Sequence, residues 1–350
     1  MALDWTTLLA NDGPVFQHDA LISFGDAADE GRALTGEAGI APLPDTGLLQ
    51  VAGEDAAEFL HSQLSNSIND MPVDSLRLAG YCNPKGRLFA VFLVLRLDGG
   101  FLLLTERRLI PALLKRLRMF VLRAKVQIED VSDAWAVFGL NGASALEALT
   151  EVTGSRDGAP LQLQRAGDLL TAQLPGDGGR TLLLSPADEA AAIWTNISTA
   201  VRACGPLAWR LLSIRAGEPV VHEGSSEAFV PQHVNLDLVN GVSFSKGCYP
   251  GQEVVARMHF LGRTNRRMYR LTSPVTEPLP AAGDRITTGE GKHAGDVVTA
   301  APGPEGVELL AVLRTEYAGR QDLDCNGLKL GFGELPYPVE SADATAGQSD

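Results

Sequence analysis

The sequence predicts an α+β fold, with two mixed units of helices and antiparallel sheets followed by a small β-barrel-like domain. Strand and helix periodicities occur in mixed order between residues 48 and 128, and the same kinds of element return between residues 135 and 203. After Arg270 the helical periodicity stops, and short strand patterns alternate with turns rich in glycine and proline. These observations together indicate the fold class.

The first unit combines hairpin strands with two helices. Residues 88–97 are almost continuously apolar, and Asp98-Gly99-Gly100 is a turn from which the next strand returns. Apolar residues at every third or fourth position predict the helices, and Pro111 suits a first turn. We expect strands over residues 48–51, 88–97, 101–105 and 126–128, and helices over residues 54–64 and 109–122.

The second unit repeats this mixture without visible sequence identity to the first. The run Ser185-Pro186-Ala187-Asp188 has the spacing of a capping box with proline at the first helical position. It predicts a helix to about Ala203, ended by Gly205-Pro206. We also expect a helix over residues 143–152 and strands over residues 135–140, 161–164, 169–174 and 181–184.

The third unit has strand patterns only, over residues 268–271, 285–288, 296–300 and 307–313. The predicted domains are an N-terminal α+β domain (20–130, completed by 206–265), a second α+β domain (131–205) and a β-barrel domain (266–340). Residues 341–350 are small and polar, which is typical of a flexible tail.

Composition favours a globular protein of the cytoplasm. Hydrophobic residues make up 45% of the 350 residues, no apolar run reaches the ~20 residues of a membrane span, and no secretory signal is visible. The four cysteines lie far apart, which argues against a disulfide framework and fits a reducing compartment. Neither cysteines nor histidines have metal-ligand spacing, so we predict no metal site.

The charge pattern argues against general nucleic-acid binding. The net charge is −14, although residues 107–125 hold seven Lys and Arg and residues 257–270 hold five arginines. The first cluster fits the solvated face of a helix. Such clusters can still hold a small anionic ligand or one face of an RNA, but we expect neither direct tRNA binding nor membrane association.

The run Lys246–Glu253 places Cys248 in a loop with Gly247 and Gly251. Because glycine permits backbone conformations closed to other residues, we expect a loop that holds the thiol in one place. The ammonium group of Lys246 would stabilise a thiolate. The alternative is a structural turn with a small buried thiol, since free cysteine is usually buried and inert.

Two other segments have two interpretations each. The run Asn83–Arg87 is an ordinary β-turn, or a turn that presents Lys85 and Arg87 to an anionic ligand. Trp209 packs in the core, or forms a wall for a flat heteroaromatic ligand. The chain has no P-loop and no G-x-S-x-G elbow, so no standard hydrolase, kinase or dehydrogenase signature is present.

Residues Phe244–Arg257 closely resemble the signature of the YgfZ family of folate-binding proteins, which is related to the T-protein (aminomethyltransferase) of the glycine cleavage system. Further segments resemble family motifs: Gly53–Leu64, Gly80–Arg87, Arg215–Pro219 and Pro231–Asp237. The resemblance spans roughly residues 20–338. It implies three domains around a central cleft that binds tetrahydrofolate or a one-carbon derivative.

The resemblance also implies a role in the synthesis or repair of iron–sulfur enzymes, chiefly [4Fe-4S] enzymes and including those that modify tRNA. Such client enzymes and cluster-assembly proteins would be the partners. Cys248 would be the reactive residue, with Lys246 as its activator. The candidate folate-binding residues are Trp209 for the pterin, Arg257 and Arg263 for the glutamate tail, and Tyr81, Lys85, Arg87, Tyr249, Gln252 and Glu253.

Three departures bear on this resemblance. T-proteins carry an aspartate a few residues after the glycine that corresponds to Gly86, whereas the residues that follow it here contain no carboxylate, so the transfer site lacks its acid/base group. T-proteins also lack the Lys-Gly-Cys loop. A second tryptophan of some family members would fall near Thr46, so that wall is missing or replaced.

Three functions therefore stay open. The first is a folate-dependent accessory factor for iron–sulfur proteins, which the cysteine loop favours. The second is a one-carbon transferase of the T-protein type, against which the missing carboxylate argues. The third is a scaffold for cluster assembly without catalysis. The sequence decides neither the chemical step at Cys248 nor whether Cys82 approaches it.

Overall fold

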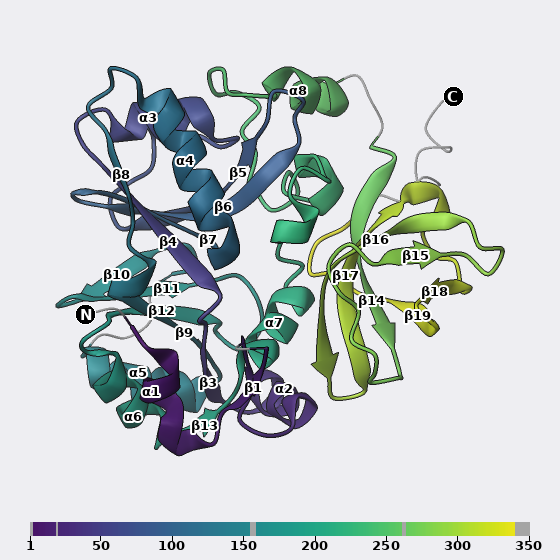
Figure 1. Cartoon of the computed structure of the whole chain (residues 1–350), viewed down its shortest axis with the longest axis horizontal. Helices are drawn as coiled ribbons and strands as arrows, with labels where there is room; N and C mark the ends of the chain where they lie inside the picture. The colour runs from purple at the N-terminus through teal and green to yellow at the C-terminus, as the bar shows by residue number, and fades with distance from the viewer. Residues whose placement is uncertain (1–2, 19, 155–158, 261–263, 340–350) are drawn as a thin grey trace.

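The computed structural model describes residues 3–18, 20–154, 159–260 and 264–339, and it confirms the predicted fold class. A five-stranded sheet, a six-stranded sheet and a closed six-stranded barrel are its main parts. Figure 1 shows the two sheets one above the other, with the barrel beside them. Arg263 and the predicted tail lie outside the described residues.

The five-stranded sheet is antiparallel, in the order β5-β6-β7-β4-β8. Both of its faces are covered, one by helices and one by the six-stranded sheet, which explains the apolar run in β6. Successive residues face opposite sides, so Leu48 packs toward the other sheet and Leu49 toward the helices. The elements are β4 (Thr46–Ala52), α3 (Ala56–Gln63), β5 (Ser75–Cys82), β6 (Leu88–Leu97), β7 (Gly100–Glu106), α4 (Ile110–Val121) and β8 (Gln127–Asp130).

The six-stranded sheet has the order β10-β11-β12-β9-β3-β13 and is antiparallel except for the pair β3 and β13. Helices α5 and α6 pack on its outer face around Phe138 and Trp194. Strand β3 pairs with β9, although it lies within the range 20–130 of the predicted N-terminal domain. The elements are β3 (Gly39–Pro42), β9 (Trp135–Asn141), α5 (Ala143–Thr153), β10 (Leu163–Ala166), β11 (Leu169–Gln173), β12 (Thr181–Pro186), α6 (Ala190–Ser198) and β13 (Arg202–Ala203).

The helix predicted from Ser185 is wrong in its limits. Ser185 and Pro186 end strand β12, α6 begins only at Ala190, and Ala203 lies in a strand. Ser185 is buried and pairs with Ala136 across the sheet, and its hydroxyl donates to the carbonyl of Pro186 instead of capping a helix. Pairing in the sheet therefore overrides the local capping pattern.

The barrel closes in the order β14-β17-β16-β15-β18-β19. The four predicted strands are confirmed, and two short strands that the sequence analysis did not predict complete the closure. Full closure leaves no free sheet edge. The elements are β14 (Arg266–Ser273), β15 (Arg285–Thr287), β16 (His293–Gly303), β17 (Gly306–Arg314), β18 (Leu323–Cys325) and β19 (Leu328–Gly333).

Helix α7 (Pro206–Arg215) lies between the six-stranded sheet and the barrel (Figure 1). Seven of its residues are buried, so it has no amphipathic stripe to mark it in the sequence. At its end, Arg215 donates hydrogen bonds to Glu308 of β17 and so connects α7 with the barrel. Among the described residues, no helix is long and apolar enough to cross a membrane.

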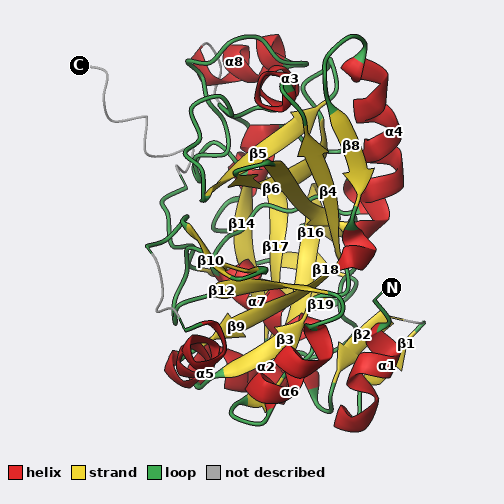
Figure 2. Ribbon diagram, turned by 90° about the vertical axis from the view of Figure 1, so that its left-hand side faces the viewer, coloured by secondary structure: helices red, strands yellow, loops and turns green. Residues whose placement is uncertain are grey.

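The remaining elements lie at the two ends of the molecule. Figure 2 shows α8 (Gln252–Phe260) and α3 at one end, with α2, α5 and α6 at the other. The N-terminal elements are α1 (Trp5–Leu9), β1 (Val15–Gln17), β2 (Ala20–Ser23) and α2 (Ala27–Gly36). Short 3₁₀ turns cover Ala10–Asp12, Arg107–Leu109, Ser132–Ala134, Glu223–Ser225, Pro231–Val234 and Thr315–Tyr317.

Candidate functional site

The cysteine loop lies directly against the turn at residues 83–87. A Cβ atom added to Gly251 would lie 2.5 Å from the carbonyl oxygen of Asn83 and 2.6 Å from Cα of Gly86. Gly251 also has a φ of +82°, a conformation that favours glycine. Gly247 has neither a positive φ nor a close neighbour, so the expectation that it shapes the loop is not supported.

Asn83 holds this turn in place. Its Oδ1 accepts hydrogen bonds from the backbone N–H groups of Lys85 (2.9 Å) and Arg87 (3.0 Å). Its Nδ2 donates to Glu227 at 2.6 Å, and the guanidinium group of Arg87 donates to the carbonyl oxygen of Ala228 at 2.7 Å. The turn is therefore both an ordered β-turn and part of the surface beside the cysteine loop.

Cys248 is exposed, whereas the other three cysteines are buried, and no two of them form a disulfide. Burial raises the pKa of Cys82 and of Cys204 to about 12, and that of Cys325 to about 11. Cys82 is only 1% exposed. Of the four thiols, Cys248 is thus the one that a reagent or partner can reach.

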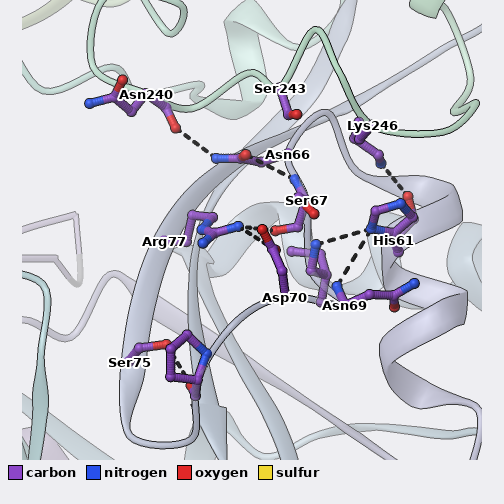
Figure 3. Close-up of polar contacts among 12 residues, drawn as sticks. His61, Asn66, Ser67, Asn69, Asp70, Ser75, Arg77, Asn240, Ser243 and Lys246 are labelled. Atoms are coloured by element: carbon purple, nitrogen blue, oxygen red, sulfur yellow. Dashed lines mark hydrogen bonds and ion pairs between the residues drawn. The ribbon is translucent and has the colours of Figure 1, made fainter.

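Lys246 points toward the end of α3. Its Nζ donates to the carbonyl oxygen of His61 (Figure 3) and to that of Leu64, the latter at 2.6 Å. The ammonium group also lies over the ring of Tyr249, 4.9 Å from its centroid. Burial lowers the pKa of Lys246 to about 8, and Cys248 acts in the opposite direction. Lys246 therefore connects the loop to α3, and its role as activator stays a prediction.

His61 is a neighbour of the loop that the sequence analysis did not single out. Its Nδ1 accepts a hydrogen bond from the backbone N–H of Ile68 at 3.2 Å, which leaves Nε2 to carry the proton (Figure 3). Nε2 lies 3.9 Å from where a Cβ of Gly247 would be. Burial and the charge of Lys246 lower the pKa of His61.

The two predicted tyrosines are buried. Tyr81 is 1% exposed, and burial raises its pKa to about 12. Burial also raises the pKa of Tyr249, with a smaller contribution from Cys82. Tyr249, which follows Cys248 in the chain, is therefore also near Cys82 in space. The ring of Tyr81 packs in the core against Phe89, and that of Tyr249 lies beneath the ammonium group of Lys246.

The other predicted ligands lie on the surface. Lys85, Arg87, Glu253 and Arg257 are exposed, and Gln252 is half-buried at the start of α8. None of these five lines either of the two cavities described below. Their role in folate binding stays a prediction, as does that of Arg263.

The first cavity, cavity 1, has a volume of about 240 Å³ and lies between the two sheets and α7. Trp209 forms part of its wall and Thr46 another part, so the position where some family members carry a tryptophan borders the same space. Polar side chains also line it: Asp45, Glu106, Arg210, Ser213, Glu218 and His222. Trp209 alone of the predicted site residues is found here.

The second cavity, cavity 2, has a volume of about 650 Å³ and shares Leu78, Leu93, Leu174, Glu218 and Pro219 with cavity 1. The two are therefore neighbouring parts of one cleft. Its wall also includes residues 242–245, which lead directly into the cysteine loop.

Polar contacts between distant segments shape the wall of cavity 2 (Figure 3). Asn66 donates hydrogen bonds to the carbonyl oxygens of Leu78 (2.8 Å) and Asn240 (2.6 Å). Arg77 pairs with Asp70 at 2.8 Å. The two hydrogen bonds of Asn66 join strand β5 to the segment that precedes Cys248.

Arg180 supports the wall that the two cavities share. Its side chain is 2% exposed and pairs with Glu218 at 2.6 Å, and its guanidinium carbon lies 5.0 Å from the ring centroid of Trp209. The indole also packs closely against Gly139, where an added Cβ would lie 2.3 Å from a ring carbon. Trp209 is therefore held rigidly, and it is only 8% exposed.

Arg210 is a further cavity residue that the sequence analysis missed. A signal was present in the sequence: Arg210 is the one charged residue in the otherwise uncharged and largely apolar run Pro206–Ile214. Burial lowers the pKa of Arg210, while Asp45 and Glu106 act in the opposite direction. Among the described residues no cluster of His, Cys, Asp and Glu has the form of a metal site.

Comparisons with known proteins agree with this architecture. Residues 14–166 match the model of the GCVT N-terminal domain. The tRNA-modifying protein YgfZ of Edwardsiella ictaluri is 32% identical over 304 residues, covering 84% of this chain and 91% of that protein. The YgfZ protein of Serratia proteamaculans is 32% identical over 310 residues, with coverage of 85% and 92%.

A solved structure shows the same fold. The glycine cleavage system aminomethyltransferase T from Bartonella henselae superposes with a TM-score of 0.76, at 17% identity, over 94% of this chain and 96% of that one. At this identity the likeness concerns the fold.

Proposed function

Since this chain belongs to the YgfZ family of tRNA-modifying proteins, we propose that it is a tetrahydrofolate-dependent accessory factor for the synthesis or repair of [4Fe-4S] enzymes, including enzymes that modify tRNA. The observation that carries the proposal is the position of Cys248. It is the exposed thiol of the four, on a loop whose preceding residues line the larger part of the cleft.

The cleft fits a folate. The volume of cavity 2 by itself is within the range of roughly 300–1,000 Å³ that is typical of small-molecule sites. Cavity 1 extends this space toward Trp209. A rigid indole beside polar side chains suits a flat ring that carries hydrogen-bonding groups on its edge. Bound tetrahydrofolate would supply a reduced pterin and a carrier for one-carbon units. Trp209 and the polar wall of cavity 1 would hold the pterin, and cavity 2 the rest of the molecule.

Cys248 would meet a client protein or a small reactant at the surface, beside the turn at residues 83–87. Lys246 would keep the loop attached to α3 and place positive charge near the thiol. The other thiols are unpaired and buried, which suits the reducing cytoplasm that we propose as its location. Client enzymes and assembly proteins are the proposed partners.

Folate binding is tested by titrating tetrahydrofolate into the protein and following tryptophan fluorescence and heat. We expect saturable binding, with most of the fluorescence change lost in Trp209→Phe, which leaves Trp5, Trp135 and Trp194 in place. Absence of binding by calorimetry in the wild-type protein would contradict the folate part of the proposal.

The role of Cys248 is tested by complementation in a strain that lacks its own family member. We expect the wild-type gene to restore the activity of [4Fe-4S] enzymes and Cys248→Ala to fail at the same protein level. Full restoration by Cys248→Ala would leave a scaffold as the better account. Turnover of an aminomethyl donor with tetrahydrofolate by the purified protein would favour a transferase instead.

A further inference from the structure

Arg210 is a half-buried charged side chain on helix α7, and the carboxylates of Asp45 and Glu106 act on it electrostatically without a hydrogen bond. Among the described residues it donates no hydrogen bond and forms no ion pair, although it lines cavity 1. Arg215 on the same helix differs from Arg210, because its guanidinium group donates hydrogen bonds to Glu308. A partly buried guanidinium group with no hydrogen-bond acceptor from the described residues favours a ligand in cavity 1 that accepts from it.

Acceptors on the wall of cavity 1 complement this donor. Asp45 has no side-chain hydrogen bond among the described residues, and Glu106 uses one carboxylate oxygen, Oε2, for His222 (3.1 Å) and the backbone N–H of Glu223 (3.0 Å). Oε1 of Glu106 has no such partner. The cavity therefore offers a fixed set of donors from Arg210 and free acceptors from Asp45 and Glu106, beside the indole of Trp209.

We propose that Arg210 is a specificity-determining residue of cavity 1, where its guanidinium group donates to the carbonyl oxygen of a flat lactam ring. This inference rests on the proposed function, in which that ring is the pterin and the oxygen is its 4-oxo group. Asp45 and Glu106 accept hydrogen bonds from the N–H groups on the same edge of the ring.

The donor chemistry of arginine makes the inference specific. A guanidinium group has five N–H donors and no acceptor, and it stays charged. A 4-oxo pteridine presents an acceptor to it, whereas a 4-amino pteridine presents a donor at the same position. A site built around a donor rejects an analogue that cannot accept, because the buried donor is then left unpaired.

The test compares folic acid with aminopterin, which differ at the 4-position alone, by calorimetric titration of the full chain. We expect the wild-type protein to bind folic acid about 10- to 100-fold more tightly than aminopterin. The affinity of Arg210→Leu for folic acid should be lower than that of the wild type by about the same factor, and the variant should bind the two compounds equally. Arg210→Gln, which keeps an amide NH2 donor but loses the charge, should lie between the two.

The control variant is Lys115→Met, an exposed cation on α4 that lines neither cavity, and it should bind both compounds as the wild type does. Circular dichroism establishes whether Arg210→Leu folds, and Arg210→Gln carries the comparison if it does not. Equal binding of both compounds by the wild type would overturn the role of Arg210 and leave the proposed function intact. Binding of neither compound, nor of tetrahydrofolate, would overturn both.

Discussion

Lys246 and Cys248 are two residues apart, yet they lie in different surroundings. The ammonium group of Lys246 is half-buried and bound to carbonyl oxygens at the end of α3, whereas the thiol of Cys248 is exposed. A cation at the C-terminal end of a helix is favourable, because the last carbonyl groups there have no partner within the helix. The lysine therefore has a structural role whatever it does for the thiol.

Thiol reactivity is the first prediction at this scale. In the native protein at neutral pH, an alkylating reagent should modify one of the four cysteines at least about 100-fold faster than the others, since the buried thiols are inaccessible and have raised pKa values. Mass spectrometry should place the label on Cys248. Fast labelling of Cys82 in native protein would contradict the described packing.

Replacing Lys246 with methionine is the second prediction. The carbonyl oxygens of His61 and Leu64 would lose their donor, so we expect the free energy of unfolding to fall by about 1–3 kcal/mol, measured by urea denaturation. Lys115→Met, on the exposed face of α4, should stay within about 0.5 kcal/mol of wild type. A loss no larger than that of this control would contradict the role assigned to Lys246.

The same variant isolates the pH dependence of Lys246. Its pKa is about 8 in the folded protein, below the ordinary value of 10.5, so between these pH values the unfolded chain binds more protons than the folded one. The stability difference between wild type and Lys246→Met should therefore shift in favour of wild type as pH rises from about 8 to 10.5. On lowering the pH through 8 this contribution is lost. If the difference in free energy of unfolding between wild type and Lys246→Met does not change between pH 8 and 10.5, the lysine is not desolvated in the folded protein.

At the scale of elements, the site depends on the contact between the cysteine loop and the turn at residues 83–87. Both segments are irregular, and neither makes its own regular hydrogen-bond ladder. Their close approach depends on Gly251, whose missing side chain lets the two backbones touch. The thiol is thus positioned by a contact between distant parts of the chain rather than by the loop alone.

Gly251→Ala tests this contact. The new methyl group would meet backbone atoms of Asn83 and Gly86 at 2.5–2.7 Å, so we expect a loss of stability well above the ~1 kcal/mol of a positive-φ strain, and a changed alkylation rate at Cys248. Gly319→Ala is the matched control, because its φ of +80° is similar and no atom lies within 4 Å of the added Cβ. Equal effects of the two substitutions would mean that the contact does not shape the loop.

At the scale of the whole molecule, the cleft exists because α7 joins the two sheets and the barrel. The segment Arg215–Pro219 at its end connects them through two charged pairs. Arg215 and Arg270 both bind Glu308 of the barrel, and Glu218 binds Arg180, which directly precedes strand β12 of the six-stranded sheet. This family motif is therefore structural as well as close to the cleft.

Glu308→Gln tests the junction between α7 and the barrel. Removing the charge leaves two arginines without their buried carboxylate, so we expect a loss of about 3 kcal/mol in the free energy of unfolding, measured by chemical denaturation. Glu290→Gln, which breaks an exposed pair with Lys292 in the same barrel, should cause no measurable change. If the two variants have equal free energies of unfolding, the junction is stabilised by apolar packing and not by the Glu308 ion pairs.

Local patterns predicted most of the fold. Helices α3, α4 and α5 and most strands of the two sheets follow from apolar periodicity, because a side chain's face is set by its position within one element. Strands β3, β5 and β13 were not predicted. The elements missed were those whose identity depends on distant partners. Helix α7 is buried on nearly all sides, and Ser185 joins a sheet instead of capping a helix.

By itself, the sequence determined the fold class, much of the succession of elements and the identity of the motif around Cys248, since these depend on residues near one another in the chain. Only the tertiary structure decided what each motif contacts. It turned Lys246 toward α3, buried Tyr81 and Tyr249, left Arg87 and Arg257 on the surface, and placed Arg210 and Trp209 in one cavity. These positions result from packing between segments more than 100 residues apart, which no local pattern records.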